Sequence, residues 1–449
     1  MTELKQGKPI KGRTVAPAPM LLLYLIVSLA GAVISHAGDP AGLCTELGGH
    51  LRAIGTVSYP DHRSIYQWVD NDPFFDRQVE LRLKHQLFMG THWTLSTHYE
   101  LAGQQGDTIQ NNNRLRAIWP AGTVVQLVGS ETMGDDRRLM NLTHTISDGE
   151  DDVVYHRLDR LNLTYAWERG TIGLGRQALT WGNGLIFNPM DLFNPFAPTT
   201  VQRDYKLGDD MLLFQFTKGD SEAQLLYLPR RDTVTGKIED DLSSYAGKWH
   251  LAVGTIEVDM MAATHFSDLI FGVGASGYKG GAAWRSDLIY TLMDSGCDRN
   301  NFFQLVANID YAWQWGGKNI YGLLEFFFNG LGEDQNYARA LSDPDISQRV
   351  ERGELFTLGR TYIGGRLSVE LHPLVQAGIT AIINISDPSA IVQPQLMWDI
   401  APNFQLIIGA NLNGGDEETE FGGFNVDTEA GTIKAAPTDS RYLWLTYYF

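Results

Sequence analysis

Short segments in which apolar and polar residues alternate recur along most of this 449-residue chain. In the segment that begins at Glu80, the side chains of Leu81 and Leu83 fall on one face of an extended backbone, and those of Glu80, Arg82 and Lys84 fall on the other. The same alternation is present in three further segments, 93–101, 161–168 and 255–262. A period of two residues predicts β-strands with one apolar face. Beyond residue 37, no apolar run approaches the ~20 residues that a membrane-spanning helix needs.

The N-terminus has the pattern of a secretory signal peptide. Four basic residues precede an apolar run from Met20 to Ile34, and the small residues Ser35 and Ala37 fit a cleavage site. We therefore expect residues 1–37 to be a signal peptide, with Met1 or Met20 as the true start. The alternative is an uncleaved inner-membrane anchor, since residues 20–37 are just long enough to span a bilayer.

Connection lengths distinguish a membrane barrel from a soluble β-sandwich. Long polar segments lie near residues 104–112, 132–153, 230–242, 330–354 and 413–438. Between them are short links: Gly90-Thr91-His92, Pro120-Ala121-Gly122, Glu168-Arg169-Gly170, Lys218-Gly219-Asp220, Val253-Gly254, Tyr278-Lys279-Gly280, Gly316-Gly317-Lys318, His372-Pro373-Leu374 and Ala401-Pro402-Asn403. Short periplasmic turns and long extracellular loops are typical of an outer-membrane barrel.

The pattern predicts an all-β fold, a transmembrane antiparallel up-and-down β-barrel of roughly 18–20 strands. Tryptophans near the short links, such as Trp93, Trp167 and Trp398, would form an interfacial girdle. We expect a periplasmic N-terminal segment at 38–48 and the barrel at 49–449, with strands at 50–58 and 112–131 the least well defined by the pattern.

One connection is too apolar to extend into water. It contains Phe187-Asn188-Pro189 and then Phe193-Asn194-Pro195, and each proline biases the preceding asparagine away from helix. We expect the loop 180–209 to fold into the barrel and narrow the pore, because a wide barrel otherwise leaves an aqueous channel. The expected pore-constriction residues are Trp181, Phe187, Asn188, Phe193, Asn194, Phe196, Arg203, Asp204 and Lys206. The alternative is a loop that caps the outer mouth.

Charged residues on the strands are expected to face the lumen, since a lysine or arginine facing lipid at the bilayer midplane costs ~2–4 kcal/mol. These side chains would pair across the barrel or create a field that selects solutes. The expected lumen-lining residues are Glu80, Arg82, Lys84, His98, Glu100, Glu257, Asp259, Arg285 and Asp287.

The last strand carries an apolar face that ends on an aromatic residue. Leu443, Leu445, Tyr447 and Phe449 lie on this face. The strand resembles the C-terminal assembly signal of Gram-negative outer-membrane proteins, and the chain as a whole resembles an outer-membrane porin-type β-barrel. The resemblance implies the cell outer membrane as location, with the barrel assembly machinery, membrane lipid and lipopolysaccharide as partners. It is also compatible with a homo-oligomer.

A narrower resemblance concerns the start of the apolar loop. Leu174-Gly175-Arg176-Gln177 followed by Trp181-Gly182 is similar to the strand-to-loop pattern of alginate-export-like barrels and related uncharacterised porins. The chain departs from the alginate exporters because no arginine-dominated lumen is evident. An anionic polysaccharide substrate therefore does not follow.

The remaining composition narrows the function. A formal net charge of −18 argues against nucleic acid as a partner. The common hydrolase, zinc-protease and phosphate-loop motifs are absent, so no catalytic residue, metal site or cofactor is expected. The favoured function is a channel for small polar solutes. The alternatives are an export conduit or partner for a polymer or lipid, and a surface enzyme or adhesin.

Overall fold

The computed structural model describes residues 42–70, 72–118, 134–200, 205–294, 299–428 and 431–449. Eighteen antiparallel strands form a closed barrel in which each strand pairs with the next along the chain. The barrel strands are β1 (Leu43–Tyr59), β2 (Phe74–Met89), β3 (Trp93–Gly106), β5 (Asp152–Trp167), β6 (Gly170–Gln177), β7 (Asp209–Lys218), β8 (Ser221–Leu228), β9 (Ser244–Val253), β10 (Ile256–His265), β11 (Asp268–Lys279), β12 (Ala282–Leu292), β13 (Asn301–Trp315), β14 (Lys318–Asn329), β15 (Thr361–His372), β16 (Val375–Asn384), β17 (Ser389–Ala401), β18 (Phe404–Gly415) and β21 (Asp439–Tyr448). The predicted fold class is confirmed.

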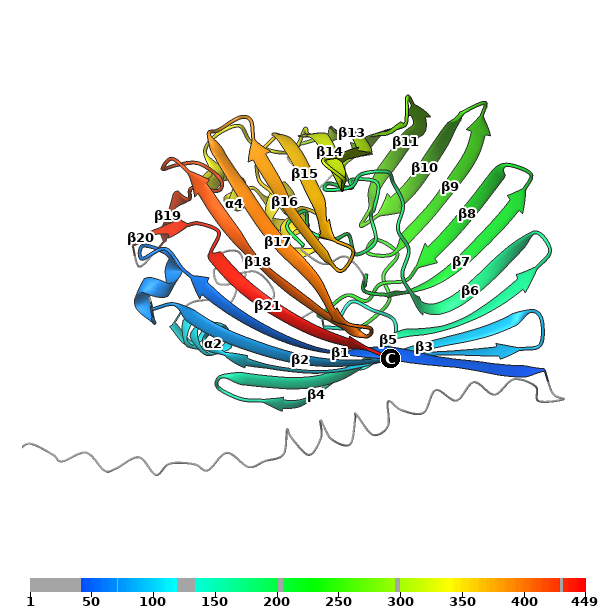
Figure 1. Cartoon of the computed structure of the whole chain (residues 1–449), viewed down its shortest axis with the longest axis horizontal. Coiled ribbons are helices and arrows are strands. Elements are labelled where there is room, and N and C mark those ends of the chain that lie inside the picture. Colours follow the sequence, from blue (N-terminus) through cyan, green and yellow to red (C-terminus); the bar gives the residue numbers. More distant parts are fainter. Residues whose placement is uncertain (1–41, 71, 119–133, 201–204, 295–298, 429–430) are drawn as a thin grey trace, which may run out of the picture.

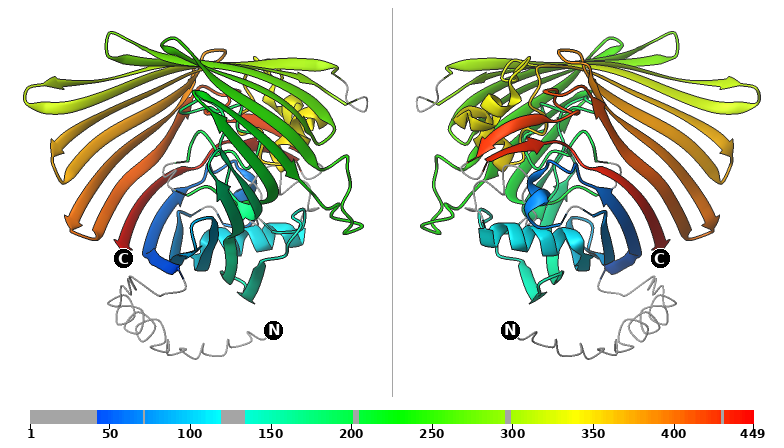
Figure 2. Two further views of the ribbon diagram at one scale, coloured as in Figure 1. Left: turned by 90° about the vertical axis from the view of Figure 1, so that its right-hand side faces the viewer. Right: turned by 90° about the vertical axis from the view of Figure 1, so that its left-hand side faces the viewer.

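The barrel closes where the last strand meets the first. β21 pairs antiparallel with β1 in a register that sets His50 opposite Tyr448, and Figure 2 shows the two strands side by side. β1 begins at Leu43, so it takes in residues of the segment 38–48 that we expected to precede the barrel. Closure leaves no free edge in the circuit, as a bilayer requires.

The expected short links connect neighbouring strands. Every one that falls within the described residues joins two adjacent barrel strands at the same end. At the link between β13 and β14, Gly316 and Gly317 both have positive φ, 58° and 76°. This conformation suits a two-residue hairpin turn and favours glycine at both positions.

The other end of the barrel carries the additional elements. They are η1 (Ile65–Trp68), α2 (Asp107–Ile118), β4 (Thr143–Asp148), α4 (Tyr337–Ser342), α5 (Pro344–Glu351), β19 (Phe424–Thr428) and β20 (Gly431–Ala435). β4 pairs with the outer part of β5, and β19 and β20 form a separate hairpin. Figure 1 shows α2 and this hairpin at the same end of the barrel.

The strand expected at residues 112–131 is wrong over residues 112–118, the part that the structure describes. Residues 112–118, expected to belong to a strand at 112–131, form part of the helix α2. The helix continues directly from β3, and its buried Leu115 packs with Ile65 and Ile433. This contact lies far away in sequence, so alternation within the segment could not reveal it. Residues 119–133, including Pro120-Ala121-Gly122, lie outside the described residues.

The outer surface of the barrel is apolar. Exposed aliphatic side chains occur on the outward faces of strands around the circumference, for example Val79 on β2, Leu174 on β6, Val273 on β11 and Leu324 on β14. Such a belt matches a hydrocarbon surrounding.

No helix among the described residues is long and apolar enough to cross a membrane. The expected signal peptide, residues 1–37, lies outside the described part of the chain.

Candidate functional site

The connection between β6 and β7 lies inside the barrel. Its described residues, 178–200 and 205–208, are here called the inner loop. At its start, Trp181 Nε1 donates to Gln224 Oε1 on β8 at 2.6 Å. Asn183 then donates twice to Asp287 on β12, from its backbone nitrogen at 2.6 Å and from its side-chain amide at 2.7 Å. The loop is therefore attached to the wall at two strands within three residues.

The firmest polar anchor is Glu325 on β14. Its carboxylate accepts backbone N–H groups from Leu185 at 2.7 Å, Ile186 at 3.0 Å and Phe187 at 2.6 Å. Asn308 on β13 donates to the same carboxylate at 3.2 Å. Three successive amides directed at one anion form a backbone nest. Glu325 thus fixes the backbone of the loop and not only one side chain.

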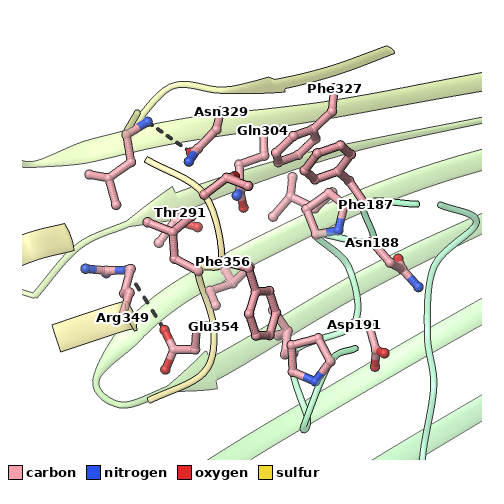
Figure 3. A pocket seen from close by; sticks show the side chains of 18 of the residues that line it. Phe187, Asn188, Asp191, Thr291, Gln304, Phe327, Asn329, Arg349, Glu354 and Phe356 are labelled. Carbon is pink, nitrogen blue, oxygen red and sulfur yellow. Dashed lines mark hydrogen bonds and ion pairs between the residues drawn. The ribbon is translucent and has the colours of Figure 1, made fainter. Parts of the chain in front are cut away.

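Aromatic stacking continues this attachment. The ring of Phe187 lies parallel to that of Phe327, with centroids 4.4 Å apart, and 5.2 Å from the ring of Tyr362 on β15. Figure 3 shows Phe187 and Phe327 face to face. Phe187 is only 4 % exposed. Its side chain belongs to a core between the loop and the wall.

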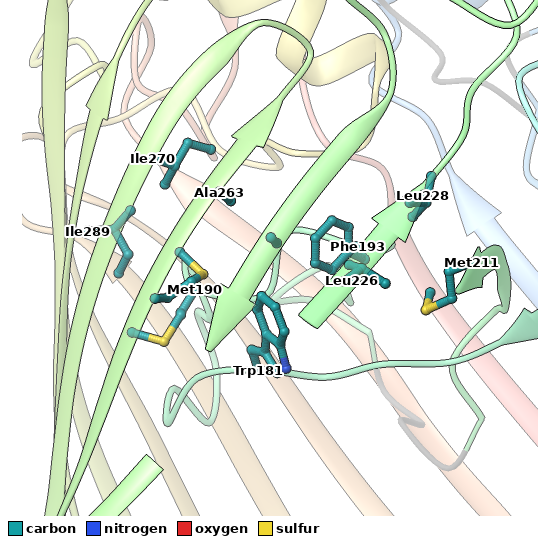
Figure 4. Packing of buried hydrophobic residues seen from close by; sticks show 11 residues of the cluster. Trp181, Met190, Phe193, Met211, Leu226, Leu228, Ala263, Ile270 and Ile289 are labelled. Carbon is teal, nitrogen blue, oxygen red and sulfur yellow. The ribbon is translucent and has the colours of Figure 1, made fainter. Parts of the chain in front are cut away.

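The next part of the loop packs on β8 to β12. Trp181, Met190 and Phe193 form a buried cluster with residues of these strands, including Ile270 and Ile289 (Figure 4). Burying one such side chain contributes roughly 1.5–3 kcal/mol. The cluster therefore holds the loop against this side of the barrel.

The returning part of the loop crosses to the opposite wall. Gln393 on β17 donates to the backbone oxygen of Thr199 at 2.8 Å. Tyr205 lies with its ring 3.6 Å from the guanidinium of Arg82, and its hydroxyl is 2.8 Å from His98 Nδ1. The loop thus contacts strands around most of the circumference.

Lys206 closes the loop onto itself. Its Nζ donates to the carboxylate of Asp191 at 2.5 and 2.7 Å and to the backbone oxygen of Leu179 at 2.5 Å. Burial raises the pKa of Asp191 to about 6, and Lys206 opposes this shift. We expected Lys206 to present its charge at the pore constriction. Its side chain is instead buried and paired with Asp191, so this expectation is wrong.

The wall formed by β1, β2, β3 and β5 carries a paired charge network. Arg82 contacts both Glu80 and Glu100, and Arg157 donates to both oxygens of Glu100. His50 Nε2 lies 3.1 Å from Glu80. Opposite charges at this density largely compensate one another, so the network is mainly structural.

The expected lumen-lining residues lie on the inner faces of their strands, in separate groups. Glu80, Arg82, Lys84, His98 and Glu100 surround Tyr205 or the charge network. Across the barrel, Asp287 holds Asn183, Asp259 lies 3.1 Å from His250, and Arg285 pairs with Asp310. Glu257 shares the face of Asp259 and is exposed.

The expected constriction residues divide into two sets. Trp181, Phe187 and Phe193 are buried against the wall, and Asn188 donates to the backbone oxygen of Trp181 at 2.9 Å. Asn194 and Phe196 line an open cavity. Arg203 and Asp204 lie outside the described residues.

Two open cavities lie beside the inner loop. An outer cavity of about 770 Å³ extends toward the long-loop end and is lined by Asn194, Phe196 and Tyr205, with Phe266 of the β10–β11 turn. An inner cavity of about 380 Å³ lies between the loop and the wall of β15–β18 and β21. Thr200 lines both cavities. The space between the loop and this wall is therefore less filled by side chains than the space between the loop and β8 to β12.

Sequence reasoning missed several anchors. Glu325 had a visible signal, because it is a single acid within the apolar stretch Leu323 to Phe328. Gln224, Gln393 and Tyr205 carried none, because their partners lie at distant positions in the sequence.

In the motif Leu174-Gly175-Arg176-Gln177, which carries the narrower resemblance, the arginine has a structural role. Arg176, fully buried at the end of β6, donates to Asp210 at 2.8 Å, to Asp135 at 2.9 Å and to the backbone oxygen of Met140 at 2.6 Å. It joins β6, β7 and the segment before β4, and its donors are occupied.

The strand that we expected to carry the assembly signal faces outward at Leu443 and Leu445. Tyr447 lies 4.7 Å from the ring of Phe404 on β18. Phe449 exchanges two backbone hydrogen bonds with Gly49, at 2.9 and 3.1 Å.

Comparison with solved structures identifies the architecture. The chain is similar to OccAB2 of Acinetobacter baumannii, with a TM-score of 0.50 and 10 % identity over 90 % of this chain and 98 % of that one. Pseudomonas aeruginosa OccK5 gives the same values. Escherichia coli Wzi, described as a carbohydrate-binding β-barrel outer-membrane protein, has a TM-score of 0.50 and 9 % identity over 97 % of this chain and 90 % of that one. No protein-family model and no curated protein sequence matches. At these identities the likeness concerns the fold, which is that of outer-membrane β-barrels.

Proposed function

We propose that the chain is a porin-like channel of the outer membrane that lets small polar solutes cross passively. The observation that carries the proposal is the pair of cavities that share Thr200. One opens toward the long-loop end, and the other lies along the wall of β15–β18 and β21. Together they would form a route beside the loop, on the side away from the buried cluster that packs the loop against β8 to β12.

The loop sets the width of this route. Its aromatic residues Trp181, Phe187 and Phe193 pack against the side of β8 to β15. Residues 194–197 border the outer cavity, Pro198 borders the inner cavity, and Thr200 borders both. The constriction therefore falls at the returning part of the loop, with Asn194, Phe196 and Thr200 as its described members. Phe187 and Phe193 support it from behind.

The proposal includes the surroundings of the channel. Outer-membrane lipid and lipopolysaccharide would cover the apolar belt, and the barrel assembly machinery would recognise the strand that ends at Phe449. A homo-oligomer would place part of the belt between protomers.

Planar bilayer recordings test the function. The purified barrel should give discrete conductance steps, and deletion of Asn188–Pro198 should raise the single-channel conductance because it removes the filling of the lumen. The matched control shortens the exposed turn 234–236, none of whose residues lines either cavity, and should leave conductance unchanged. A barrel with no conductance in either form would refute the channel.

The export-conduit alternative makes a different prediction in the same experiment. A polymer needs the loop to leave the wall, so the intact barrel would be silent and the deletion would open it. The narrower resemblance to alginate-export-like barrels gains no support from Arg176, because its guanidinium is buried among two carboxylates.

A further inference from the structure

The inner cavity has an unusual lining for a protein with a net charge of −18. Most of its polar groups are uncharged side chains that both donate and accept hydrogen bonds. These residues are Thr200, Thr380, Gln393, Gln395, Gln405, Tyr442 and Tyr448. No aspartate or glutamate is among its described lining residues, and Arg366 is the one charged side chain there.

Arg366 differs from the arginines elsewhere on the inner wall. Arg285 pairs with Asp310, and Arg82 pairs with Glu100. Among the described residues, no hydrogen bond or ion pair engages the Arg366 guanidinium, and the side chain is half-buried. A charge without a nearby counter-charge in a narrow, partly enclosed space acts on solutes more strongly than a paired one.

The lining also offers apolar surface and room. Met397 and Ile407 lie between the amide side chains. A Cβ at Gly409 would come within 2.3 Å of the Tyr442 hydroxyl. Glycine therefore lets the Tyr442 ring lie along the wall instead of across the cavity. Amides and hydroxyls next to apolar strips can replace the water around a solute that has both C–H faces and hydroxyl groups.

We propose that this cavity favours small solutes rich in hydroxyl or amide groups over cations of the same size, and that Arg366 excludes the cations. A neutral solute exchanges hydrogen bonds to water for hydrogen bonds to the lining at little cost. A cation loses hydration, meets Arg366 and finds no carboxylate in the described lining to compensate. The inference rests on the proposed channel function and adds the class of solute.

Proteoliposome swelling with two matched probes tests the selection. Glucose and glucosamine have similar size, and at about pH 6 the amino group of glucosamine is protonated. The native protein should admit glucose much faster than glucosamine. Arg366→Gln should remove most of this difference by raising the glucosamine rate.

The control is Arg441→Gln, which removes the same charge from a side chain exposed on β21. It should keep the native ratio of rates, and circular dichroism should show that both variants keep their strand content. Equal rates for the two probes in the native protein would overturn the inference, as would an Arg366→Gln ratio equal to that of Arg441→Gln. If neither sugar enters, the channel function itself fails, whereas a channel that prefers the cation refutes the selection alone.

Discussion

The two sides of the lumen differ in the contacts that they make with the inner loop. The covered wall, formed by the inner faces of β8 to β14, holds the loop with Gln224, Asp287 and Glu325 and buries its aromatic rings. The open wall, formed by β15–β18 and β21, contacts the loop at Phe187, whose ring centroid lies 5.2 Å from that of Tyr362, and again near Thr199. Elsewhere it borders the inner cavity, mainly with amides and hydroxyls. The covered wall therefore makes most of the contacts that position the loop. The open wall provides most of the polar side chains that a solute in the inner cavity would meet.

The largest effect should come from removing the main anchor of the covered wall. Glu325→Ala leaves three loop amides without their acceptor, which should cost at least about 4 kcal/mol, since a hydrogen bond to a charged group contributes roughly 1.5–3 kcal/mol. The loop should become accessible to protease, and single-channel conductance should rise. Glu257→Gln, an exposed acid on the inner face of β10, should change neither. A loop that stays protected in Glu325→Ala would mean that apolar packing alone holds it.

Phe187→Ala tests that packing. Loss of the stack on Phe327 and of buried area should destabilise the loop by about 3 kcal/mol. The unfolding temperature should fall in heat-mobility assays, with a smaller rise in conductance than for Glu325→Ala. Phe303→Ala removes a ring from the outer surface, where Phe303 stacks on Phe328 at 4.9 Å. This variant should leave conductance as it is, and an equal response of both variants would contradict the distinction between the walls.

Gln393→Ala should have a moderate effect, because it removes the hydrogen bond of the open wall to Thr199. The cost should be about 1 kcal/mol. We expect more frequent fluctuations of the open-channel current and little change in the unfolding temperature. A steady current would show that Thr199 is positioned by its neighbours alone.

The smallest change in conductance should be that of Gly409→Ala, although the new Cβ, 2.8 Å from the backbone oxygen of Pro394, should cost about 1–3 kcal/mol of stability. The new methyl group would push the Tyr442 ring into the cavity, so conductance should fall although the fold persists. Gly414→Ala on the same strand is the control, since a Cβ there meets no atom within 4 Å. An unchanged conductance in Gly409→Ala would place the solute route elsewhere.

Much of the fold could be predicted because it depends on local patterns. The alternation that begins at Glu80 and the short links fixed the strand directions and the face that meets lipid. The prolines after Asn188 and Asn194 marked the irregular loop. The helix at 112–118 was missed because its burial depends on Ile65 and Ile433, which no local pattern connects to it.

The candidate site was less accessible to sequence reasoning. Lys206 is a charged loop residue, and only the fold brings Asp191 close enough to bury both. Asn188 and Asn194 occupy the same position in the repeated motif, yet Asn188 donates to the backbone oxygen of Trp181 and Asn194 borders the outer cavity. The repeat gave no indication of this difference.

The sequence by itself determined a closed barrel with an apolar outer face and an apolar loop that must be buried. These features follow from the spacing of apolar residues and from their preference for a non-aqueous surrounding. The tertiary structure alone decided which wall receives the loop and which stays open. That choice depends on contacts between residues more than a hundred positions apart, such as Glu325 with Leu185, Ile186 and Phe187. Such contacts exist only once the strands are arranged around one lumen.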